Sequence, residues 1–109
     1  MELHKYYVVM LRRPAEAPDF SAAELDELQA AHLAYLSGLR EQGIVAMNGP
    51  LLDAPDPSLR GLSFYATATA EEAREFAAAD PMVRAGRLSF DVVTFATPPG
   101  ALVRPGHPL

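Results

Sequence analysis

Two side chains have the types and positions that acid–base chemistry requires, His32 and Asp80. His32 lies one helical turn from both Leu28 and Leu36, in a leucine stripe that should face the protein interior. An interior imidazole beside a carboxylate is oriented by it and can act as a general base near neutral pH. If His32 and Asp80 meet, they would form a catalytic pair. Their distance along the chain leaves that question open.

Each of the two residues also has a structural interpretation, which its position alone favours. His32 could be a core histidine whose ring nitrogens bond to a backbone carbonyl or a tyrosine. Asp80 precedes Pro81 and could simply cap the helical turn that begins there.

Three further residues are candidates for binding a substrate. Tyr7 and Ser63 carry hydroxyl groups that could line a pocket, although such residues more often pack in a core. Gly49 lies between Asn48 and Pro50, where a backbone N–H could approach a ligand. Turn geometry explains that segment equally well.

Metal and cofactor motifs are missing from the sequence. There is no cysteine, and His4 and His107 lie near opposite ends of the chain, with no spacing that joins them to His32. A glycine-rich phosphate loop, a dinucleotide fingerprint and an H-E-x-x-H motif are also absent. We therefore expect no metal and no cofactor, which leaves imidazole and carboxylate as the reactive groups.

The elements that must position these residues can be inferred from apolar spacing and turn signals. The order strand, helix, strand, strand, helix, strand is expected at residues 6–11, 21–43, 44–47, 62–66, 69–80 and 88–96. Ser21 with Glu24, and Thr69 with Glu72, are capping pairs at the two helix starts, and a further helical turn is expected after Asp80. This order predicts an α+β, ferredoxin-like fold with a four-stranded antiparallel sheet.

The strands are apolar on both faces, which is unusual for a sheet covered by helices on one side only. Val8 and Met10 should point one way, and Val9 and Leu11 the other. We expect the uncovered face to pack against that of a second copy in a homodimer. The alternative is that the tail, through Leu102 and Val103, folds back over this face.

Length and charge narrow the class of protein. The 109 residues, 50% of them hydrophobic, indicate one globular domain at 1–97, followed by a proline-rich tail at 98–109. The net charge of -5 argues against a nucleic-acid or membrane-surface partner. No apolar run approaches the roughly 18 residues that span a bilayer, and no signal peptide is evident. We expect a soluble cytoplasmic protein with a small-molecule ligand.

Three segments in this order and spacing resemble the YciI-like (YCII-related) proteins over about residues 6 to 95. They are His32-Leu33-Ala34-Tyr35-Leu36, Asn48-Gly49-Pro50-Leu51 and Asp80-Pro81-Met82-Val83-Arg84-Ala85-Gly86. The resemblance implies a dimeric α+β barrel, and a pocket whose proposed histidine–aspartate dyad falls on His32 and Asp80. Relatives include a chlorohydroquinone dehydrochlorinase, and muconolactone isomerases share the barrel. Several members carry an arginine shortly before the histidine, where this chain has Leu28-Gln29-Ala30-Ala31.

Three functions are compatible with these residues. The first is a cofactor-free lyase or isomerase in which His32 moves a proton on a small cyclic substrate and Asp80 holds the ring. The second is a non-catalytic dimeric module for ligand binding or interaction, with the pair buried for structure. The third is a haem or flavin monooxygenase of the same barrel, with His32 as a haem ligand. A pocket in which both residues are open favours chemistry, whereas a closed pair favours structure.

Overall fold

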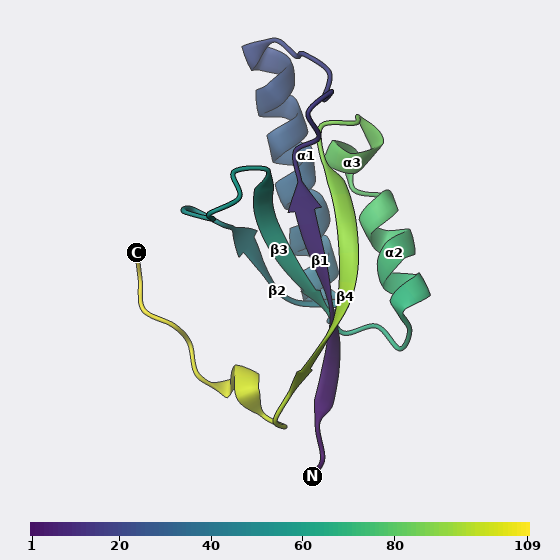
Figure 1. Ribbon diagram of the computed structural model, residues 1–109, viewed down its shortest axis with the longest axis vertical. Coiled ribbons are helices and arrows are strands. Elements are labelled where there is room, and N and C mark those ends of the chain that lie inside the picture. The colour runs from purple at the N-terminus through teal and green to yellow at the C-terminus, as the bar shows by residue number, and fades with distance from the viewer.

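The computed structural model describes the backbone of residues 1–109 and every side chain except that of Val103. The elements are β1 His4–Arg12, α1 Ala22–Glu41, β2 Val45–Pro50, β3 Leu59–Tyr65, α2 Ala70–Ala78, α3 Pro81–Arg84, β4 Ser89–Thr97 and the 3-10 helix η1 Ala101–Val103. The predicted order is confirmed, and α3 is the additional helical turn expected after Asp80 (Figure 1).

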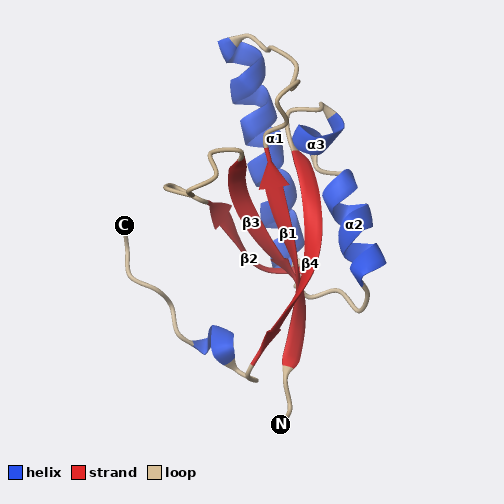
Figure 2. Ribbon diagram, in the orientation of Figure 1, coloured by secondary structure: helices blue, strands red, loops and turns tan.

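The four strands form one antiparallel sheet in the order β2-β3-β1-β4, so β1 and β3 are central (Figure 2). Helices α1 and α2 pack on the same face. Tyr7, Val9 and Leu11 of β1 join one buried cluster with Leu36 of α1 and Ala73 of α2. The arrangement is the ferredoxin-like fold predicted from the element order.

Local signals begin and end the helices where they were predicted. Ser21 Oγ accepts from the backbone N–H of Glu24 at 3.1 Å, and Glu24 Oε1 accepts from the backbone N–H of Ser21 at 2.9 Å. These bonds lower the pKa of the Glu24 carboxyl. Gly43 follows α1 with φ of 75°, the left-handed conformation that glycine adopts most readily. Among the described helices, none is long and apolar enough to cross a membrane.

The opposite face of the sheet carries apolar side chains with no helix over them. We call it the open face, and define it by Tyr6, Val8, Met10, Met47, Leu62, Phe64, Val93 and Phe95, which the strand register places on one side. Val93 and Phe95 are each 45% exposed. Phe64 and Phe95 meet edge to face, with ring centroids 5.5 Å apart. The prediction of strands that are apolar on both faces is confirmed.

The tail leaves β4 and makes the short turn η1 at one edge of the open face. Leu102 borders a shallow hollow there with Met47 and Phe95. Leu102 itself stays 47% exposed, and the last residues lead away from the sheet (Figure 1). The described part of the tail therefore leaves the open face uncovered. The side chain of Val103, also named in the covering alternative, lies outside the described residues.

Candidate active site

His32 and Asp80 meet in the folded chain. His32 projects from the middle of α1, and Asp80 occupies the junction between α2 and α3. Nδ1 of His32 lies 2.7 Å from Oδ2 of Asp80 and 2.9 Å from Oδ1. The structure thus joins two residues that are 48 positions apart.

Asp80 is held by its own backbone setting. It is the N-cap of α3, with φ of -60° and ψ of 129°, and Pro81 begins the helix after it. Its Oδ1 accepts from the backbone N–H of Met82 at 2.9 Å. Asp80 is 2% exposed, so water has almost no access to its carboxylate. The carboxylate instead contacts the backbone N–H of Met82 and Nδ1 of His32. The cap predicted for Asp80 and the contact with His32 coexist in one carboxylate.

This arrangement determines which nitrogen of His32 is available. An ionised carboxylate has no proton to donate, so Nδ1 of the imidazole must carry the proton that joins the two groups. In the neutral ring, Nε2 is then left with its lone pair. The His32 side chain is 12% exposed and lines a cavity that Asp80 does not reach. The imidazole is therefore oriented from behind by Asp80 and presents its other edge to the cavity.

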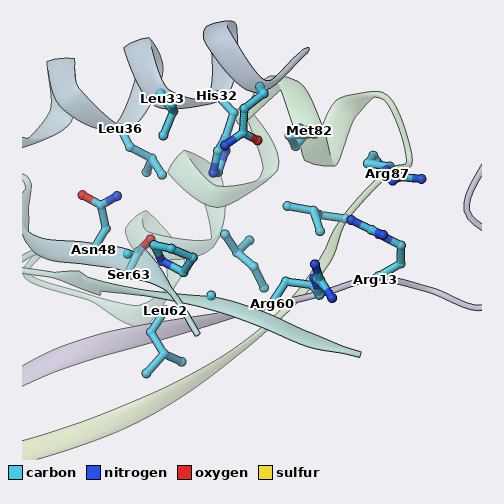
Figure 3. A pocket seen from close by; sticks show the side chains of 16 residues that line it. Arg13, His32, Leu33, Leu36, Asn48, Arg60, Leu62, Ser63, Met82 and Arg87 are labelled. Atoms are coloured by element: carbon cyan, nitrogen blue, oxygen red, sulfur yellow. The ribbon is translucent and has the colours of Figure 1, made fainter. Parts of the chain in front are cut away.

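The cavity lies between α1 and the ends of β1, β2 and β3, with α3 closing one side, and has a volume of about 250 Å³ (Figure 3). Its apolar lining comes from Leu11, Leu33, Leu36, Pro50, Met82 and Leu88, and its polar lining from Arg13, Gln29, His32, Asn48, Arg60, Ser63 and Arg87, with Gly49 and Gly61. Leu62 also borders the cavity, but its side chain points away from it, toward the open face (Figure 3). An apolar cavity of about 150 Å³ holds a benzene molecule, so this one can take a single substituted ring.

The candidate binding residues divide between cavity and core. Ser63 and Gly49 line the cavity, together with Asn48, which lies opposite Ser63 in the sheet. Tyr7 is not among the residues that line it, and its role in binding stays a prediction. It is 7% exposed and packs in the core, four residues along β1 from Leu11, which does reach the cavity.

Two tyrosines flank the pair on the core side. The Tyr35 hydroxyl donates to the backbone carbonyl of Phe76 at 2.8 Å, which ties α1 to α2. Burial raises the pKa of Tyr35, and the nearby Asp80 carboxylate raises it further. Burial, followed by Tyr35 and Asp80, also raises the pKa of Tyr65. Both phenols therefore stay neutral beside the charged carboxylate.

Three arginines that the sequence pattern did not single out reach the cavity. Arg13 follows β1, Arg60 belongs to β3, and Arg87 follows α3. They come from three separate segments with no shared spacing, so no local pattern could have shown that they gather. A basic cluster was also hidden by the acidic balance of the whole chain. Among the described residues, no group of three His, Cys, Asp or Glu side chains could hold a metal ion.

Fold and site together define a ferredoxin-like α+β domain with a buried histidine–aspartate pair beside a small cavity. Residues 5–96 match the family described as YCII-related domain. The chain therefore belongs to the YCII-related family, whose fold is a dimeric α+β barrel. The resemblance noted from the sequence motifs is confirmed.

A solved structure supports the fold. The chain is similar to 5-chloro-2-hydroxyhydroquinone dehydrochlorinase from Burkholderia phenoliruptrix, solved in complex with 2,5-dihydroxybenzoquinone. The two are 23% identical, with a TM-score of 0.56 over 84% of this chain and 91% of the other. Comparison with the curated proteins gives no match.

Proposed function

We propose that this protein is a cofactor-free lyase or isomerase that uses His32 as a general base on a small cyclic substrate. The observation that carries the proposal is the His32–Asp80 contact of 2.7 Å, made by a ring that also lines a cavity of about 250 Å³. Asp80 is a positioning residue in this scheme because it touches the imidazole and not the cavity.

The chemistry follows from the available nitrogen. Nε2 of His32 takes a proton from a hydroxyl or activated carbon of the substrate. The electron pair left behind forms a new double bond. In a lyase, the leaving group departs with its bonding pair, and in an isomerase His32 returns the proton to another carbon. Asp80 stabilises the imidazolium that forms between these steps.

The solved dehydrochlorinase supports the choice of substrate class. Its name describes dehydrochlorination of a chlorinated hydroxyhydroquinone, and it was solved in complex with 2,5-dihydroxybenzoquinone, which is also a single ring. The cavity of this chain accepts one such ring by volume. A small hydroxylated or chlorinated ring, or a lactone, is therefore the class of substrate to test.

One observation favours a second function, a non-catalytic ligand-binding or accessory module. Asp80 is 2% exposed and caps α3, as expected for a pair retained for structure. The criterion of an open or a closed pair therefore gives a mixed result. His32 lines the cavity, whereas Asp80 is buried behind it. Catalysis must then depend on His32 alone touching the substrate.

The test is a screen of chlorinated hydroquinones and unsaturated lactones against the whole protein. Chloride release and deuterium uptake from D2O report the two reaction types. We expect His32→Gln to lower the rate on an active compound by about 100- to 10,000-fold. His4→Gln is the matched control, because the His4 side chain is exposed and lies beside Glu2, away from the cavity. Equal rates for wild type and His32→Gln would contradict the proposal.

We also propose that two copies of this chain pack open face to open face. The exposed side chains Val93 and Phe95 and the uncovered sheet support this assembly, and the family to which the chain belongs has a dimeric barrel fold. A dimer of this kind would bury the open face on the side of the sheet opposite to the cavity.

A further inference from the structure

Three guanidinium side chains gather at one end of the His32 cavity. Arg13, Arg60 and Arg87 lie together there, while Asn48 marks the opposite end (Figure 3). His32 projects from α1 between the two ends. The cavity therefore has a cationic end and an imidazole within the length of one small ligand.

Among the described residues, no carboxylate forms an ion pair with any of these three arginines. In the part of the chain that the structure describes, no aspartate or glutamate lines the cavity. The neighbouring Arg12 shows the contrast, since it pairs with Asp56 at 3.1 Å and with Asp91 at 2.9 Å. A chain with net charge -5 has acidic residues in excess, yet none is placed at this end.

Arg13 itself carries an unmet hydrogen bond. Its Nε is buried and has no partner among the described atoms. A buried donor without an acceptor is unfavourable in a folded protein and calls for a partner that is not part of the chain. Burial, and then the charges of Arg87 and Arg60, lower the pKa of Arg13. An anion placed among the three would remove both the unmet bond and the repulsion.

We propose that Arg13, Arg60 and Arg87 form an oxyanion subsite that binds the carboxylate of a small monocyclic acid. The guanidinium fork matches a planar carboxylate in two parallel hydrogen bonds. Leu36 and Met82 line the cavity beyond the cations and offer apolar contact to a ring. With its carboxylate held at the arginines, the ring extends toward His32. Delivery of the ring to a base rests on the proposed function, whereas binding of the acid does not.

Three probes test the ligand class: benzoate, the uncharged benzamide and inorganic phosphate, each titrated into the full chain at low ionic strength. Isothermal calorimetry and the ring signals of His32 in NMR report binding. We expect benzamide to bind at least about tenfold more weakly than benzoate, because it lacks the charge-assisted bonds. Phosphate should also bind more weakly, since it has no ring. Equal affinity for benzoate and benzamide, or phosphate binding as tightly as benzoate, would overturn the assignment.

Substitutions then locate the subsite. Arg13→Gln and Arg87→Gln should each weaken benzoate at least about tenfold. Arg74→Gln removes the same charge from α2, where Arg74 lies near Glu71 outside the cavity, and should leave affinity unchanged. We expect Arg13→Gln to raise or preserve the melting temperature, since the native state loses an unmet donor, whereas a structural arginine would lower it. Unchanged benzoate affinity in Arg87→Gln, which also serves if Arg13→Gln does not fold, would reject the subsite.

A histidine variant separates this inference from the proposed function. His32→Gln should retain benzoate affinity within about threefold, because the carboxylate is held by the arginines. If wild type binds benzoate but no ring compound is turned over, the subsite stands and the proposed catalysis fails. If turnover depends on His32 while benzoate binds no better than benzamide, the reverse holds.

Discussion

The imidazole of His32 and the carboxylate of Asp80 approach to 2.7 Å, and the same carboxylate caps α3 through the backbone N–H of Met82. One side chain therefore joins α1 to α3 and selects the proton-bearing nitrogen of the ring. Asp80 thus both holds α1 against α3 and prepares His32 for proton transfer.

Two substitutions at Asp80 separate these roles. Asp80→Asn keeps an oxygen for Met82 but turns an amide donor toward His32, so the neutral ring should carry its proton on Nε2 instead of Nδ1. Nitrogen-15 NMR of the imidazole measures this change. Asp80→Ala also removes the cap and should lower the free energy of unfolding by about 2–4 kcal/mol in urea titration. An Asn variant as unstable as the Ala variant, with its tautomer unchanged, would favour a purely structural pair.

The open face leads to a prediction about assembly. Phe95→Glu places a charge among side chains expected to meet a second copy, so the dimer should dissociate at micromolar concentration. Sedimentation velocity measures the mass. Leu52→Glu makes the same change at a loop residue that is 71% exposed, and should leave the dimer intact. A wild-type protein that sediments as a monomer would exclude the proposed assembly.

We expect the ionisation of Tyr65 to lower the free energy of unfolding at alkaline pH. It is 1% exposed and stacks on Phe76, and burial raises its pKa above the ordinary value of 10.0. The native state therefore favours the neutral phenol, whereas the unfolded chain loses this proton above about pH 10. The contribution of Tyr65 to the free energy of unfolding is complete below about pH 10 and falls as the pH rises further. The slope is at most about 1.4 kcal/mol per pH unit.

Tyr65→Phe lacks the ionisable group, and its free energy of unfolding should fall less steeply above about pH 10. Urea titrations of both proteins at several pH values measure the difference. Parallel curves would show that the phenol ionises equally easily in the folded and unfolded chains.

Much of this fold follows from local sequence. The capping pair of Ser21 and Glu24 and the turn begun by Pro81 act over a few residues, and each is found where the sequence predicts it. The apolar strands likewise predicted a sheet with two hydrophobic faces, since side chains alternate along any strand.

The site depended on tertiary structure. No spacing brings His32 to Asp80, and the contact exists because α1 and α3 pack on the same side of one sheet. Tyr7 illustrates the limit of a strand pattern, because alternation shows which face a residue occupies but not which end of that face is hollow. Arg13, Arg60 and Arg87 meet only where three segments converge, and the net charge of the whole chain conceals such a cluster. Hydrogen bonds within a turn or a helix cap join residues that are close in sequence, so the sequence predicts them. The residues around a cavity come from distant elements, so only the packing of those elements determines which side chains meet there.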